Sequence, residues 1–264
     1  MIDPTQALAG LLVGTIVGLT GVGGGSLMTP ILVLVFQVPP VTAVGTDLLH
    51  AAVTKACGTW VHSRHRRVDW RIVVLLGSGS VPAAFITLLL VHRLSAPGSS
   101  RLVTLTLGVA LLLTAGALIL SLLRNLRRRT VALKVGPAVA GGSARALRTG
   151  MTVGAGALLG VLVSISSVGA GALGIVALYL LYPRLTTARI VAVDIAHAVP
   201  LTLVAGLGHW MFGSVDARLL VSLLVGSLPG IYFGSHLAGR VPEALLRTVL
   251  AATLVLAGYR LLSL

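Results

Sequence analysis

The chain consists of long apolar stretches separated by short polar segments. A run of about 20 apolar residues can cross a bilayer as a helix. Six stretches predict such spans: 42–63, 71–92, 102–123, 187–210, 217–238 and 244–263. Two others, 5–37 and 150–183, are too long for one crossing and are interrupted by small residues at 21–26 and 164–171. We therefore expect each of these two stretches to form two half-helices of about 12 to 17 residues. The unwound backbone between them is tolerated at membrane depth where protein or a watery cavity lines it.

The polar residues within these stretches recur at an offset of 147 residues. The pair in Asp47-Leu-Leu-His50 returns in Asp194-Ile-Ala-His197. Further matches at this offset are Asp69 with Asp216, His62 with His209, Gly79-Ser80 with Gly226-Ser227, and Pro82 with Pro229. The recurrence indicates an internal duplication. It predicts a first membrane repeat over 1–123, a basic cytoplasmic linker over 124–148 and a second membrane repeat over 149–264.

Lys and Arg positions predict how the repeats are oriented, because cytoplasmic loops carry an excess of positive charge. If each broken segment returns the chain to its starting side, fifteen basic residues are cytoplasmic and four are outside. If each broken segment crosses once, the numbers are thirteen and six. The first arrangement is favoured and predicts two inverted repeats, each a broken or re-entrant helix pair plus three transmembrane helices. The second would make the repeats parallel.

Composition agrees with a membrane protein of the all-α class. Hydrophobic residues make up 56% of the chain and charged residues 10%, whereas a soluble domain has about 25% charged residues. The net charge of +14 comes from basic residues between apolar runs, which is typical of membrane topology and argues against a nucleic-acid partner. The chain lacks the common hydrolase, zinc-protease, dithiol and phosphate-loop motifs, so we expect neither an enzyme nor a cofactor.

Asp47 and Asp194 are the first candidate functional residues. A carboxylate at mid-membrane costs about 2.5 to 3.5 kcal/mol or more, so it is expected to face the protein interior and to have a partner. His50 and His197 follow three residues later, on the same helical face. Inverted repeats bring matching residues to one midplane site, and a histidine beside a carboxylate is a natural proton carrier. We therefore predict that the two pairs meet and carry a coupling proton; the alternative is two neutral hydrogen bonds that tie helices together.

Lys55 follows Asp47 by about two helical turns and has no counterpart in the second repeat, where Thr202 stands. Its ammonium group could pair with a carboxylate or attract an anion. It could equally extend to the membrane surface on its flexible stem. The sequence leaves these alternatives open.

The two glycine-rich interruptions are the second candidate site. A half-helix N-terminus exposes unpaired N–H groups and the positive end of a dipole, which suits an anion. The predicted substrate-binding residues are Gly23, Gly24, Gly25, Ser26, Gly169 and Gly171. Glycines also serve close helix packing, which is the alternative interpretation.

Several of these segments resemble one known family. Residues 21–30 (Gly-Val-Gly-Gly-Gly-Ser-Leu-Met-Thr-Pro), 39–48 (Pro-Pro-Val-Thr-Ala-Val-Gly-Thr-Asp-Leu) and 68–70 (Val-Asp-Trp) are similar to the TauE/SafE, or toluene sulfonate uptake permease, family. The resemblance extends over essentially the whole chain. It implies a multi-pass carrier in the bacterial inner membrane for sulfite, sulfonates or related organosulfur anions, often an exporter driven by the proton gradient. The implied substrate region falls on the glycine-rich interruptions.

The leading hypothesis is therefore a proton-coupled secondary transporter, a probable exporter of a small sulfur-containing anion. One rival is a divalent-metal carrier, in which the two aspartates and two histidines form a tetrahedral site. The other is an intramembrane enzyme that uses these residues around a metal. Lipid, protons and a small anion are the expected partners, and the oligomeric state is left open.

Overall fold

The computed structural model contains helices and no strands among the residues that it describes. Those residues are 3–20, 25–64, 68–94, parts of 105–119, 142–169, 171, 173–237 and 243–262. Most of the predicted span 102–123 and most of the predicted linker lie outside them.

Several helices in the two halves of the chain can be matched at the repeat offset. The first repeat contains α1 (Pro4–Thr20), α2 (Gly25–Leu34), α3 (Pro40–Arg64) and α4 (Trp70–Leu94). The second contains α6 (Gly142–Ser166), α7 (Leu173–Leu181), α8 (Thr187–Met211), α9 (Ala217–Leu237) and α10 (Glu243–Leu262). The bounds of α3 and α8 differ by the repeat offset at both ends, and the second interruption separates α6 from α7 as predicted. Residues 21–24 of the first interruption lie outside the described residues.

The first helix of the second repeat is longer than predicted. α6 has 25 residues, whereas the apolar pattern predicted a half-helix of about 12 to 17 residues too short for a crossing. Its apolar part, Ala146–Ser166, is long enough to span a membrane. The prediction failed because α6 continues past the apolar boundary through Ala144–Arg148, where Ala, Arg and Leu favour a helix regardless of their polarity.

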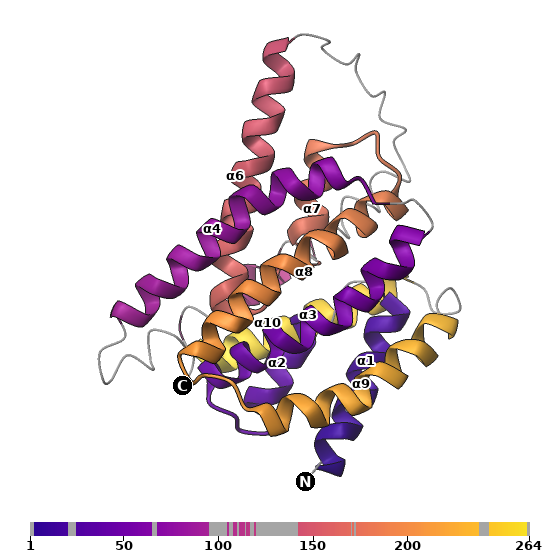
Figure 1. The fold of residues 1–264 in the computed structure, drawn as a ribbon. Coiled ribbons are helices and arrows are strands. Elements are labelled where there is room, and N and C mark those ends of the chain that lie inside the picture. Colours follow the sequence, from indigo (N-terminus) through magenta and orange to yellow (C-terminus); the bar gives the residue numbers. More distant parts are fainter. Residues whose placement is uncertain are drawn as a thin grey trace.

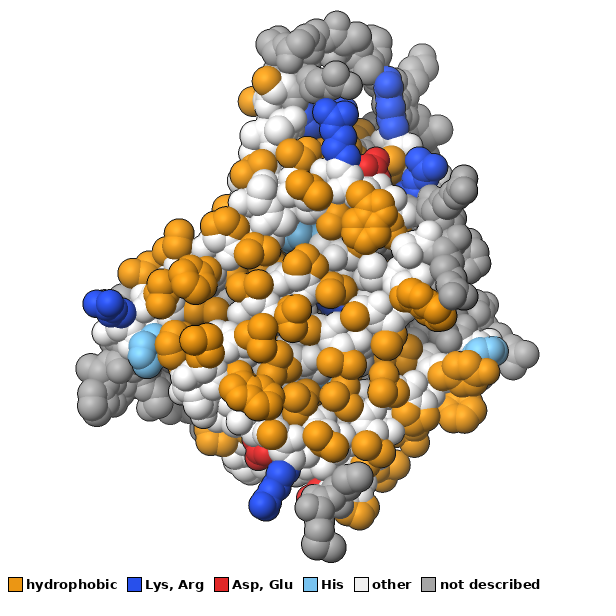
Figure 2. All heavy atoms as spheres, in the orientation of Figure 1, with side chains coloured by type: hydrophobic (Ala, Val, Ile, Leu, Met, Phe, Trp, Pro, Cys, Tyr) orange, Lys and Arg blue, Asp and Glu red, His pale blue; other side chains and the backbone are white. Residues whose placement is uncertain are grey.

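The outer surface fits a lipid environment. Four described helices are long and apolar enough to cross a membrane: Trp70–Arg93, Ala146–Ser166, Ala188–Met211 and Ala217–Gly234. On the face shown in Figure 2, apolar side chains cover the middle, and the Lys, Arg and acidic side chains lie toward its edges. Large side chains such as Phe85, Leu158 and Phe233 are more than half exposed. The protein is therefore an all-helical, multi-pass membrane protein.

The two repeats interlock around one central helix pair. α3 and α8 lie side by side in the middle of Figure 1, with α4 and α6 packed together on one side and α1 and α9 on the other. The first helix of each repeat thus packs against the fourth helix of the other repeat. This exchange leaves no separate core for either half.

Glycines permit the close approach in both exchanged pairs. Gly226, Gly230 and Gly234 follow a four-residue spacing along α9, and an added Cβ at each would overlap the backbone of α1. On α6, Gly156 and Gly160 face the backbone of α4 in the same way. Small residues at this spacing let membrane helices pack at short range, where dispersion replaces the hydrophobic effect as the driving force.

The central helices run in opposite directions. An added Cβ at Gly58 of α3 would touch Ile195, near the start of α8, while Gly206, near the end of α8, lies against Leu49. The early part of each helix is therefore level with the late part of the other.

Gly79→Ala should destabilise the protein, because the new Cβ would overlap the Val153 carbonyl oxygen and the Ala157 amide of α6. Such overpacking costs about 1–3 kcal/mol, more than the 0.5–1 kcal/mol or so that alanine recovers in a helix. We expect a lower melting temperature of the detergent-solubilised protein.

Gly77→Ala is the matched control, since nothing lies within 4 Å of its added Cβ. Its melting temperature should equal or exceed that of the unsubstituted protein. A Gly79→Ala protein that melts no earlier than Gly77→Ala would contradict the packing account.

Candidate functional site

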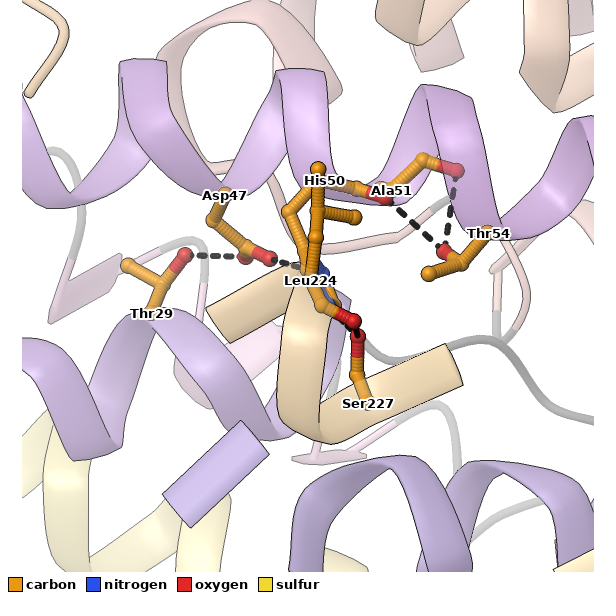
Figure 3. Close-up of polar contacts among 7 residues, drawn as sticks. All are labelled: Thr29, Asp47, His50, Ala51, Thr54, Leu224 and Ser227. Atoms are coloured by element: carbon orange, nitrogen blue, oxygen red, sulfur yellow. Dashed lines mark hydrogen bonds and ion pairs between the residues drawn. The ribbon is translucent and has the colours of Figure 1, made fainter. Parts of the chain in front are cut away.

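Asp47 is fully buried on α3. The Thr29 hydroxyl on α2 donates a hydrogen bond to its Oδ2, and His50 Nδ1 lies 3.9 Å from its Oδ1 (Figure 3). The Ser167 hydroxyl, from the interruption of the other repeat, also interacts with this carboxylate but is not within hydrogen-bond geometry. One carboxylate oxygen thus has a firm partner, and the other is available for a proton or a ligand.

The two histidines form a crossed pair of contacts between the repeats. His50 Nε2 hydrogen-bonds Ser227 Oγ of α9 at 2.8 Å (Figure 3), and His197 Nε2 hydrogen-bonds Ser80 Oγ of α4, also at 2.8 Å. The two serines are themselves related by the repeat offset. Each histidine is therefore held by the other repeat, and all four side chains are buried.

Asp194 lies against the start of α7. An added Cβ at Gly174 would overlap its Oδ1, and its carboxylate interacts with the backbone N–H of Gly171. Neither carboxylate oxygen has a partner in hydrogen-bond geometry, although the side chain is buried. The carboxylate thus occupies the end of α7 where the helix dipole is positive and where an anion is stabilised.

The local sequence explains the interruption between α6 and α7. The Ser166 hydroxyl accepts a hydrogen bond from the Val168 N–H and donates to the Leu162 carbonyl, which satisfies backbone groups at the end of α6. Gly169 and Gly171 adopt φ of 118° and 127°, values that side chains disfavour and glycine accepts readily. Helical hydrogen bonding resumes when the Leu173 N–H donates to the Gly169 carbonyl.

Among the predicted substrate-binding residues, Gly169 and Gly171 form this interruption. Gly25 and Ser26 begin α2, while Gly23 and Gly24 lie outside the described residues. The described interruption adjoins both carboxylates, since Ser167 faces Asp47 and Gly171 faces Asp194.

The two Asp–His pairs lie at different levels along α3 and α8, whereas the sequence led us to expect that they meet at one midplane site. Because α3 and α8 are antiparallel, Asp47 is level with the end of α8, about 20 Å along the helix from Asp194 at 1.5 Å per residue. In the described part of the chain, no three His, Cys, Asp or Glu side chains come together as metal ligands. The tetrahedral metal site required by the rival hypothesis is therefore not formed by these residues in this structure.

Lys55 lies between the two aspartates. It is 4% exposed, so its stem does not extend to the membrane surface, and it interacts electrostatically with both Asp194 and Asp47. Of the alternatives left open by the sequence, its burial excludes extension to the membrane surface, and its electrostatic attraction to the two carboxylates agrees with a role as their counter-charge.

Three partners in this site were not predicted from the sequence. Ser80 and Ser227 match at the 147-residue offset, but the sequence pattern did not show that α4 and α9 each contact helices of the opposite repeat. Thr29 has no equivalent hydroxyl, because Val176 occupies its position in the second repeat. A polar residue recurring inside two apolar helices was the available signal for the serines.

Buried ionisable side chains on packed helices, beside a broken helix within an apolar exterior, are typical of a membrane transporter. The chain matches the family described as "Sulfite exporter TauE/SafE" over residues 6–261. It belongs to the TauE/SafE family of membrane transporters, as the sequence motifs predicted, and not to a family of enzymes.

Full-length relatives support this assignment. A probable membrane transporter protein of Bacillus subtilis, YjnA, is 35% identical over 97% of this chain and 98% of its own length. A second, YdhB from the same organism, is 28% identical over 95% of this chain and 96% of its own length. A probable membrane transporter protein of Xylella fastidiosa is 34% identical over 35% of each chain. No solved structure shows a significant match.

Ser80→Ala should destabilise the protein by about 1–3 kcal/mol, because it leaves a buried imidazole nitrogen of His197 unsatisfied. A lower melting temperature is expected, and combining Ser80→Ala with His197→Phe should cost less than the sum of the single changes.

Ser78→Ala on the same helix is the control, since Ser78 is exposed and bonds only its own helix. It should leave the melting temperature unchanged. Additive effects of Ser80→Ala and His197→Phe would contradict a direct bond between these two side chains.

Proposed function

We propose that the protein is a proton-coupled secondary transporter that exports a small sulfur-containing anion, such as sulfite or a sulfonate, across the bacterial inner membrane. The nature of the cargo is supported by the family's description. The observation that carries the coupling is the burial of Asp47 and Asp194, each followed three residues later by a buried histidine. One carboxylate oxygen of Asp47 and both of Asp194 lack a hydrogen bond.

Charge balance supports a role for protons. The site already holds two carboxylates and one ammonium group, from Lys55. An incoming anion would add a further negative charge in a medium of low dielectric, where uncompensated charge is very costly. A proton that neutralises one carboxylate removes this cost. Proton uptake and anion binding are therefore expected to favour each other.

The start of α7 suggests how the two events are linked. The carboxylate of Asp194 now takes the place where the glycine-rich backbone, at Gly169 and Gly171, would otherwise present N–H groups to an anion. A protonated Asp194 has no charge to be held there, so a sulfonate or sulfite oxygen can replace it. In this scheme proton and anion enter the site together, and a monovalent anion crosses without net charge. Export then runs down the gradient of the anion itself, and not on the inward proton gradient that the family resemblance implied.

The arrangement of helices supports an inverted repeat. Equivalent helices α3 and α8 run antiparallel, and the contacts of α1 with α9 and of α4 with α6 are exchanged between the halves. We propose that residues 1–123 and 149–264, joined by the linker 124–148, are the two inverted units. Rocking of one unit against the other would open the site to each side of the membrane in turn.

Purified protein in liposomes tests this function. An outward gradient of a small alkyl sulfonate, which stays a monovalent anion at every pH used, should move protons in the same direction, as followed with an internal pH dye. Asp47→Asn combined with Asp194→Asn should abolish this proton movement, because an amide cannot take up the proton.

Asp69→Asn is the matched control: its carboxylate caps the exposed start of α4 by accepting from the Arg71 N–H, so proton movement should persist. Proton-coupled flux that survives the double substitution would overturn the coupling assignment. Transport of neither sulfonate nor sulfite would overturn the proposed cargo.

A further inference from the structure

Lys55 breaks the symmetry of the site. Its counterpart Thr202 donates its hydroxyl to the Ala198 carbonyl of its own helix, so the second repeat has no charge at this position. A buried ammonium group is costly unless oppositely charged groups compensate it. Its retention at one of two equivalent positions therefore calls for a physical reason.

The crossing of α3 and α8 supplies that reason. Gly58 on α3 lies against Ile195 on α8. The equivalents of these two residues in the other repeat are positions 205 and 48, and each is one residue from the observed contact between Gly206 and Leu49. The crossing is therefore symmetric, and its centre lies where each helix is level with its own equivalent, near Thr54 and Leu201. Lys55 is adjacent to this centre. A second lysine from the other repeat would meet it there and repel it.

From the centre, Lys55 has access to both carboxylates. Asp47 lies seven residues before Thr54, and Asp194 lies seven before Leu201 in the opposite direction, each about 10 Å away along its helix. Lys55 interacts electrostatically with both. The other titratable groups on the packed helices are His50, held by Ser227, His197, held by Ser80, and His209, which bonds the Ser164 carbonyl.

We propose that Lys55 is the shared counter-ion of Asp47 and Asp194, a positioning residue that pairs with one carboxylate while the other carries the transported proton. One ammonium group balances one carboxylate, so the pair is neutral when a single proton is present. Movement of the flexible lysine side chain from one aspartate to the other moves the protonation site across the centre of the molecule. This inference rests on the proposed function, since it assigns a partner to the coupling residues.

The duplication provides a direct test. Lys55→Thr should lower sulfonate-driven proton movement in liposomes by about tenfold or more, because both carboxylates lose their counter-ion. Adding Thr202→Lys to this variant returns the ammonium group from the other side of the centre and should restore most of the flux. Lys55→Thr with undiminished coupling would overturn the proposal.

The swapped variant also separates a shared counter-ion from a local packing role. A lysine on α8 cannot replace a packing role of Lys55 on α3. If the swapped variant melts within a few degrees of the unsubstituted protein but does not restore proton movement, the proposal is overturned. Should Lys55→Thr alone fail to fold, the swapped variant and Lys55→Gln answer the same question.

Infrared absorption of protonated carboxyl groups provides a measure that does not depend on the cargo. Lys55→Gln should increase this absorption at neutral pH, and the swap should return it to its original level. An unchanged band in Lys55→Gln would contradict the counter-ion role. If instead the band responds as expected but no sulfur anion is transported, the proposed cargo fails and the role of Lys55 stands.

Discussion

The cost of placing ionisable side chains inside a membrane protein governs this structure. Asp47, His50, Lys55, Asp194 and His197 all lie in the interior of a protein whose exterior is apolar. Each such group must find a partner within the protein, because lipid offers none. The antiparallel crossing of α3 and α8 brings these groups together, and the exchanged outer helices supply Ser80 and Ser227 as partners for the histidines.

This constraint also explains why the halves interlock. A histidine bonded within its own repeat would allow the two repeats to separate without losing that bond. Here each imidazole is held by a serine from the opposite repeat, on a helix that glycines bring within backbone contact of a further helix. The histidine–serine hydrogen bonds and the close helix packing therefore join the same two halves. Any relative motion of the halves must preserve or exchange these hydrogen bonds.

The sequence was sufficient for those features that depend on local periodicity. The apolar stretches predicted α3, α4, α8, α9 and α10, and the second glycine-rich interruption predicted the break between α6 and α7. It was insufficient where helix directions decide the outcome. The expectation that both Asp–His pairs meet assumed that equivalent residues converge at the axis, whereas the axis passes near Thr54 and leaves Asp47 and Asp194 on either side. Contacts such as Ser80 with His197 depend on which helices cross, and hydropathy carries no such information.

The two carboxylates are equivalent in sequence but not in chemistry. Asp47 accepts a hydrogen bond from the Thr29 hydroxyl, whereas the second repeat offers Val176 at that position and Asp194 faces the glycine backbone before α7. A hydroxyl can reorient to donate to a carboxylate or to accept from a carboxylic acid, while a backbone N–H can only donate. Asp47 thus retains a matched partner in both protonation states, whereas a protonated Asp194 can offer the backbone N–H only a neutral carbonyl oxygen, which is a weaker acceptor. In the proposed mechanism, proton uptake by Asp194 therefore weakens its hold on the glycine-rich backbone before α7, whereas Asp47 is a proton site whose surroundings change little.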